Sequence, residues 1–206
     1  MRGCDVALLG LIEVGLACSG RANSNTLPPE LQVLGAPSQT LDVKFPLSSP
    51  PYAVNVQPGG TLQASDTVDA PEADVGPLSK HGSNLFVFMM VDPDINTTHP
   101  TYVGLHTMVA NLTPYNENGA ASHSSHPFTT VATYIAPEPP AGEFHDYTLL
   151  AFHQPPHFSI PAKYASYVAT TPTSPLNRIN FPLQQFIADT NLGPVVAANW
   201  FKEGSA

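Results

Sequence analysis

The chain has 206 residues, a formal charge of −9 and 23 prolines. Its 42% hydrophobic content suffices for a packed core, whereas charged residues make up only 11%, against roughly 25% in average globular domains. Nucleic-acid binding and anchoring to anionic membranes both need a basic face, so the acidic composition argues against either. Proline is about twice as frequent as usual, which favours a loop-rich, mainly β chain over a helical bundle.

The N-terminal segment has the three parts of a secretory signal. A positive charge at Arg2 is followed by a short apolar stretch, residues 6–17, and by the small residues Ser19, Gly20 and Ala22. This pattern predicts a signal peptide over residues 1–22 and a secreted, extracellular protein. The apolar stretch is shorter than the ~20 residues of a transmembrane helix. An amphipathic N-terminal helix is the alternative.

Two further features bear on export. Cys4 and Cys18 both lie within the predicted signal, so residues 23–206, which we expect to form one domain, have no thiol for a disulfide or a metal site. Asn96 and Asn111 each begin a tripeptide of the N-glycosylation acceptor pattern. The sequence therefore predicts a secreted glycoprotein that is stable without disulfides, as a chain of this length can be.

Hydrophobic patterning predicts strands along most of the chain. Residues 23–40 are polar and read as an extended lead-in, and residues 64–84 as an acidic surface loop. Seven consecutive apolar residues at 85–91 predict a strand buried on both faces. The remaining predicted strands cover 41–45, 52–56, 105–112, 131–135, 146–154 and 195–201.

One helix is expected near residues 181–190. Asn180 is a candidate N-cap, Pro182 suits a first turn, and Leu183 and Phe186 give an apolar face. With many strands and few helices, the predicted fold class is mainly β and sandwich-like, with peripheral helices.

Polar residues gather at the ends of three predicted strands. Asp92 and Asp94 end one strand, His106 lies early in the next, and His145 and Tyr147 open a third. Neighbouring strands would bring these ends to one rim of a sheet, where imidazole and phenol donors suit a phosphate or carboxylate oxygen. Two alternatives remain: histidines satisfied within the core, and a zinc site, which the spacing does not specify.

Three blocks of the chain, in this order, resemble the phosphatidylethanolamine-binding protein family. The first is Asp92-Pro93-Asp94 after an apolar strand, with His106 following. The second is the proline-rich loop ending in Pro139-Pro140-Ala141-Gly142, then His145 and Tyr147. The third runs from Arg178-Ile179-Asn180-Phe181 into the C-terminal residues 191–201. The resemblance covers roughly residues 28–202.

The resemblance implies a large central antiparallel sheet, a smaller sheet and peripheral helices around a small anion pocket. Members of the family bind phospholipid head groups, phosphate or small carboxylates, and others inhibit kinases or serine proteases, including carboxypeptidases. Carried over position by position, the pocket would use Asp92, Asp94, His106, Pro140, Gly142, His145 and Tyr147.

Three departures from the family pattern fall beside this pocket. Ile95-Asn96 follow Asp94 where the family usually has alanine and proline. Asp146 stands where the family has an arginine, and Gly104-Leu105 stand where it has a tryptophan or histidine. Exchanging a cation for an anion near the site predicts a weaker attraction for phosphate, on the order of a kcal/mol or more.

The sequence thus favours a non-enzymatic, monomeric binding protein for a small anion or phospholipid head group, without cofactor or metal. The alternative is an inhibitor of a serine carboxypeptidase, another protease or a kinase through protein–protein contact. A third hypothesis is a hydrolase with His106 or His145 as general base. The chain contains neither a Gly-x-Ser-x-Gly nor a His-Glu-x-x-His motif, which ranks this hypothesis last.

Overall fold

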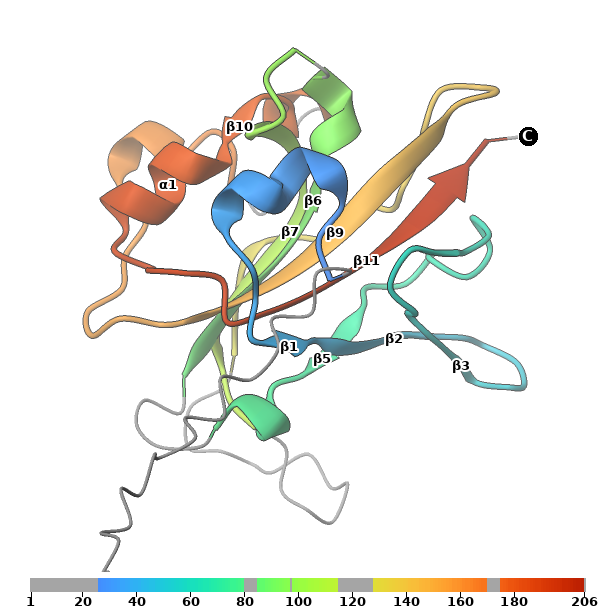
Figure 1. The fold of residues 1–206 in the computed structure, drawn as a ribbon, viewed down its shortest axis with the longest axis horizontal. Coiled ribbons are helices and arrows are strands. Elements are labelled where there is room, and N and C mark those ends of the chain that lie inside the picture. Colours follow the sequence, from blue (N-terminus) through green and yellow to red (C-terminus); the bar gives the residue numbers. More distant parts are fainter. Residues whose placement is uncertain (1–25, 80–84, 97, 115–127, 170–174, 206) are drawn as a thin grey trace, which may run out of the picture.

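Two β-sheets and a group of short helices build the fold (Figure 1). The computed structural model describes residues 26–79, 85–96, 98–114, 128–169 and 175–205. The predicted signal peptide, residues 1–22, lies outside the described residues, so secretion stays a prediction.

The large sheet has the strand order β1-β11-β9-β6-β7-β10, with β4 added to β11 and β8 added to β7. Its long strands pair antiparallel, whereas the two-residue strands β1 and β4 run parallel to β11. The sheet is therefore mixed at one edge rather than wholly antiparallel as expected. Its strands are β1 (Gln39–Thr40), β4 (Gly60–Thr61), β6 (Phe86–Asp92), β7 (Tyr102–Leu112), β8 (Thr129–Ala132), β9 (Phe144–His153), β10 (Phe181–Pro182) and β11 (Ala197–Gly204).

The small sheet has the order β3-β2-β5, all antiparallel. The predicted strands at 41–45 and 52–56 correspond to β2 (Asp42–Pro46) and β3 (Ala53–Asn55). The predicted loop at 64–84 is wrong in part, because it contains β5 (Glu72–Asp74) and the 3-10 helix η2 (Gly76–Leu78). Burial of Ala73 and Val75 between acidic neighbours explains the strand, and this apolar signal is too short to stand out in the sequence.

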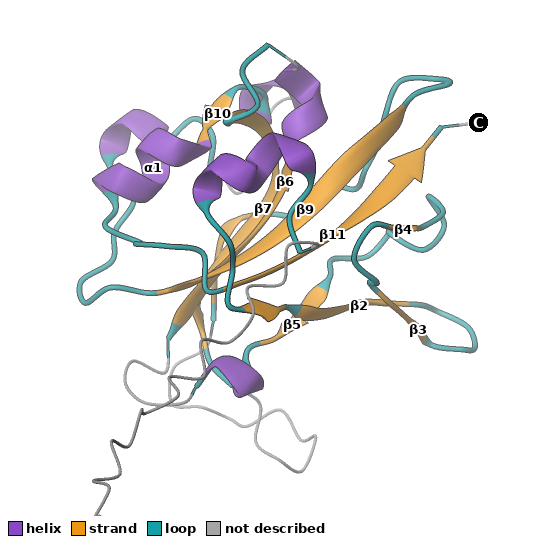
Figure 2. Cartoon of the chain, in the orientation of Figure 1, coloured by secondary structure: helices purple, strands orange, loops and turns teal. Residues whose placement is uncertain are grey.

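Helical segments cover the face of the large sheet opposite the small sheet (Figure 2). The expected extended lead-in is wrong at η1, where burial of Leu31 favours a helical turn. Among the described residues, no helix is both long and apolar enough to span a bilayer. These segments are η1 (Pro29–Leu34), η3 (Pro93–Asn96), η4 (Ala162–Tyr164), η5 (Pro175–Arg178) and α1 (Leu183–Asp189).

The helix expected near 181–190 is α1, but its start differs from the prediction. Pro182 is the N-cap residue, and no side chain caps the helix. Asn180 instead adopts a positive φ of 60° and accepts a hydrogen bond from Asn96 Nδ2 at 3.0 Å. Asn180 therefore ties η3 to the segment before α1 and does not cap the helix.

Strand β6 separates two hydrophobic cores, as its unbroken apolar run predicts. All seven of its residues are buried. Val87, Met89 and Val91 belong to the core under the helices, whereas Phe86 and Phe88 belong to the core between the sheets. β6 therefore contacts both cores, and its C-terminal end places Asp92 at the rim of the large sheet.

Candidate functional site

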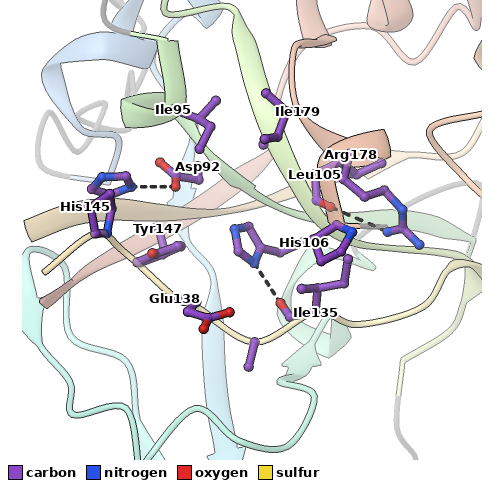
Figure 3. Close-up of a pocket in the computed structure, with 14 residues that line it drawn as sticks. Asp92, Ile95, Leu105, His106, Ile135, Glu138, His145, Tyr147, Arg178 and Ile179 are labelled. Carbon is purple, nitrogen blue, oxygen red and sulfur yellow. Dashed lines mark hydrogen bonds and ion pairs between the residues drawn. The ribbon is translucent and has the colours of Figure 1, made fainter. Parts of the chain in front are cut away.

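The C-terminal end of β6 and the N-terminal ends of β7 and β9 meet at one rim of the large sheet. Asp92 pairs with Gly104, and Val91 pairs with Thr148. A cavity of about 200 Å³ opens at this rim (Figure 3). Its wall is formed by Asp92, Ile95, Gly104, Leu105, His106, Ile135, Ala136, Glu138, Pro140, His145, Tyr147, Pro175, Arg178 and Ile179.

A β-bulge turns His106 toward this cavity. Met90 pairs with Thr107 and Val91 pairs with Leu105, so His106 is an extra residue without a partner on β6. Such a bulge redirects a side chain that regular alternation would point elsewhere. The imidazole of His106 consequently meets the ring of Tyr147 edge-on, with centroids 5.1 Å apart.

His106 is held as a neutral imidazole with one nitrogen open. Burial lowers the pKa of His106 below its ordinary 6.5, against the opposing effect of its bond to Ile135. Its Nδ1 lies 2.7 Å from the carbonyl oxygen of Ile135, and a carbonyl oxygen can only accept. Nδ1 therefore carries the proton, and Nε2 is left as a hydrogen-bond acceptor.

Two carboxylates favour the protonated form of His145, because each of its ring nitrogens faces one of them. Its Nδ1 donates to Asp92 Oδ2 at 2.7 Å, and its Nε2 faces Glu143 Oε2 at 3.5 Å. The hydrogen bond to Asp92 raises the pKa of His145 above 6.5 and outweighs the effect of burial. The second oxygen of Asp92 accepts the backbone N–H of Asp94 at 2.8 Å, which fixes the carboxylate.

Tyr147 forms the floor between the two histidines. Its ring stacks on Phe201 with centroids 5.4 Å apart and lies 6.3 Å from the His145 ring. Burial raises the pKa of Tyr147, with a further contribution from Asp92, so its hydroxyl is a donor at neutral pH. The described part of the chain supplies no hydrogen bond to this hydroxyl.

Three residues near the rim, two of them expected in the pocket, do not line the cavity. Asp94 supports the site from outside, because its Oδ2 accepts the backbone N–H of Asp146 at 2.6 Å. Gly142, expected in the pocket, lies in the preceding loop with φ of 79° and donates its N–H to Ser205. Asp146, expected to add negative charge to the pocket, accepts a hydrogen bond from Lys202 Nζ at 2.9 Å instead.

The position of Asp146 follows from strand alternation. Neighbouring residues of a strand point to opposite faces, so Asp146 lies on the other face from His145 and Tyr147. Asp146 therefore lies outside the cavity wall, and its effect on anion affinity stays a prediction. The acidic side chains beside the cavity are Asp92, Glu138 and Glu143.

Arg178 is a wall residue that the sequence reasoning did not assign to the pocket. It is 2% exposed, and its guanidinium donates to the carbonyl oxygens of Thr133 and Ala169 at 3.2 and 2.9 Å. It also approaches the carbonyl of Leu105 at 3.5 Å, and among the described residues it forms no ion pair. Arg178 thus joins η5 to β7 and to the segment before Ile135, two sides of the cavity.

The other predicted modification and metal sites are placed as follows. The Nδ2 atoms of Asn96 and Asn111 donate to Asn180 and Thr129, so a glycan on either asparagine would have to take the other N–H of that amide. Glycosylation stays a prediction. Across the described ranges, no group of three His, Cys, Asp or Glu side chains is arranged to hold a metal ion, so the zinc alternative has no support.

Solved structures share this fold. The chain resembles a carboxypeptidase Y inhibitor crystallised with its cognate proteinase, at 20% identity and a TM-score of 0.56 over 83% of this chain and 85% of that one. It also resembles a phosphatidylethanolamine-binding protein from Plasmodium vivax, at 15% identity and a TM-score of 0.50 over 82% and 87% of the two chains. At these identities the likeness concerns the fold alone.

Sequence comparison gives the family. Two curated relatives are both called phomoidride biosynthesis cluster protein N. The one from Talaromyces stipitatus is 29% identical over 94% of this chain and 97% of its own, and one from another fungus (Fungal sp.) is 33% identical over 64% and 58%. The family model for phosphatidylethanolamine-binding proteins matches residues 5–201. The chain therefore belongs to the phosphatidylethanolamine-binding protein family.

Proposed function

We propose that this protein is a non-enzymatic binding protein whose rim pocket holds the acid group of a small ligand. Candidate ligands are a carboxylate, a phosphate or a phospholipid head group. The observation that supports this most strongly is the convergence of three different groups on one cavity: cationic His145, the Tyr147 hydroxyl and the neutral imidazole of His106.

The charges around the cavity limit which acids suit it. His145 provides a cation, but Asp92, Glu138 and Glu143 place three carboxylates beside it. A doubly charged anion would be repelled by these carboxylates, whereas an acid with one charge, or one that keeps its proton, would be less affected. The pocket therefore favours weakly charged acids over phosphate dianions.

The curated relatives support a small organic ligand over a protein target. Their printed name places them in a biosynthesis cluster, and one of them is aligned over nearly its whole length. A binding protein that works beside a biosynthetic pathway would handle small organic molecules. The absence of hydrolase motifs from the sequence supports a role in binding and not in turnover.

The proposal predicts that acid ligands perturb the two pocket histidines and spare the others. Ring signals of His106 and His145 are expected to shift saturably in NMR titrations with acetate, phosphate and phosphorylethanolamine. His153, exposed at the end of β9, and His157 serve as internal controls, because neither lines the cavity. Unchanged His106 and His145 signals at millimolar concentrations of all three ligands would contradict the proposal.

The second candidate function is inhibition of a serine carboxypeptidase, another protease or a kinase. The fold of the carboxypeptidase Y inhibitor is the specific observation that favours it. Inhibition assays with the full chain and with a form starting at residue 27 separate the two candidates. Stoichiometric inhibition that added acid ligands do not change would support the inhibitor function and argue against the pocket as the functional site.

A further inference from the structure

Most of the cavity wall is apolar, and a bare anion would leave this apolar surface uncovered. Ile95 and Ile179 both line the cavity, and the close-up draws them at its upper end, away from Tyr147 and Glu138 (Figure 3). Leu105 and Ile135 extend this wall. Ile95 is 37% exposed and Ile179 is half-buried, so both keep apolar surface that a ligand can cover. The wall therefore calls for a ligand with an apolar body.

The size of the cavity limits the length of this body. Its volume of about 200 Å³ lies below the ~300–1,000 Å³ typical of drug-sized ligands. At ~30 Å³ for each water-sized group, it has room for on the order of seven such groups. The two acyl chains of a phospholipid do not fit this space, whereas a chain of a few methylenes does.

The polar end of the cavity matches a carboxylic acid group. The open Nε2 of His106 accepts a hydrogen bond, and the neighbouring hydroxyl of Tyr147 donates one. A carboxylic acid presents the complementary pair, since its O–H donates and its carbonyl oxygen accepts. An alkylammonium group would offer only donors and would leave the Tyr147 hydroxyl without an acceptor.

Gly104 keeps the space beside Nε2 open. A methyl group built on Gly104 would lie 3.9 Å from His106 Nε2 and 3.5 Å from Asp92 Cβ. Both separations are ordinary van der Waals contacts, so the strand could accept alanine without strain. The missing side chain thus makes room for a ligand atom between the imidazole and Asp92.

We infer that the ligand is a short-chain aliphatic carboxylic acid, with its acid group between His106 and Tyr147 and its chain along Ile95 and Ile179. This inference rests on the proposed function and names the ligand class for the same pocket. It makes Gly104 and the two isoleucines the residues that select this class over bare anions and head groups.

Calorimetric titration of the full chain with acetate, butyrate and hexanoate at one pH tests the inference. Each added methylene is expected to tighten binding about fourfold, so hexanoate, with four more methylenes, should bind roughly 250-fold more tightly than acetate. Hexylamine, with the same chain and the opposite charge, is expected to bind far more weakly than hexanoate. Phosphorylethanolamine tests whether the ligand is instead a phospholipid head group, and it is expected to bind no better than acetate.

Variants separate the two ends of the site. Ile95→Thr/Ile179→Thr should remove most of the advantage of hexanoate over acetate, because the chain of hexanoate then lies against polar hydroxyls. Gly104→Ala should weaken both acids at least tenfold and still fold, since alanine in place of glycine also lowers the entropy of the unfolded chain. Val68→Thr is the matched control, because Val68 is 65% exposed and lies outside the cavity wall.

The outcomes distinguish this inference from the proposed function. Equal affinities for acetate and hexanoate, or hexylamine as the tightest ligand, would overturn the aliphatic acid while leaving a pocket that binds small ions. Hexanoate binding that Ile95→Thr/Ile179→Thr and Gly104→Ala do not weaken would place the site elsewhere. No binding of any acid, with unchanged signals of His106 and His145, would contradict the proposed function itself.

Discussion

Replacement of Arg178 by methionine is expected to destabilise the protein by about 3–5 kcal/mol. Methionine fills much of the same volume but cannot make the hydrogen bonds from the guanidinium of Arg178 to the partly buried carbonyl oxygens of Thr133 and Ala169. Each hydrogen bond to a charged group is worth about 1.5–3 kcal/mol, and the contact with the Leu105 carbonyl is lost as well. The total is a large share of the ~5–15 kcal/mol that stabilises a typical domain.

Urea unfolding of the wild type and Arg178→Met measures this loss. Lys44→Met is the matched control, since it also removes a cation but breaks only the exposed pair with Glu72, in which Lys44 is 52% exposed. The control should lose at most about 1 kcal/mol. If Arg178→Met lost no more than the control, Arg178 would not be the link that joins η5 to β7.

Replacement of Asp92 by asparagine is expected to abolish the cationic state of His145 at neutral pH. The raised pKa of His145 depends first on the hydrogen bond to Asp92. Because the pKa is higher in the folded than in the unfolded protein, this pair stabilises the fold fully below pH 6.5, and the contribution disappears as the pH rises through the folded pKa. A hydrogen bond between charged groups is worth about 1.5–3 kcal/mol, so the variant should lose about this much at pH 6 and little at pH 9.

NMR titration of the His145 ring measures its pKa, and urea unfolding at pH 6 and pH 9 measures the loss of stability. Asparagine can still accept the N–H of Asp94, so the turn after β6 is preserved. Asp146→Asn is the matched control, because that carboxylate pairs with Lys202 on the other face of β9. If the pKa of His145 were as high in Asp92→Asn as in the control, Asp92 would not be the group that raises it. A loss of stability that is equal at the two pH values would lead to the same conclusion.

The long strands and both cores could be predicted from hydrophobic patterning. The apolar run of β6 forms the central strand, as expected, because a strand covered on both faces has no polar side to break its pattern. Short elements were beyond this reasoning. The two-residue strands β1 and β4 and the turn η1 contain too few residues for a period to appear, and they owe their places to tertiary contacts.

The polar part of the site was predicted better than its apolar part. Asp92, His145 and Tyr147 end or begin strands, and such ends meet when neighbouring strands are antiparallel. The bulge at His106 has no sequence signal, because it depends on the register of two strands. Alternation along β9 could have placed Asp146 on the far face, since it separates the two pocket residues in sequence.

Ile95 comes from η3, Arg178 from η5 and Ile179 from the residue directly after η5, and none of them lies in the strands whose ends were predicted to meet. Only the packing of these helical turns over the rim brings them to the cavity. The apolar wall, and with it the preferred class of ligand, therefore follows from tertiary structure alone.

The most direct test of the account is a crystal structure with 6-bromohexanoate, read from the anomalous signal of bromine. One bromine peak is expected between Ile95 and Ile179, with the acid group within hydrogen-bond distance of His106 Nε2 and the Tyr147 hydroxyl. A bromine peak at another surface, with the rim cavity free of ligand at saturating concentration, would contradict the claim that this cavity is the binding site.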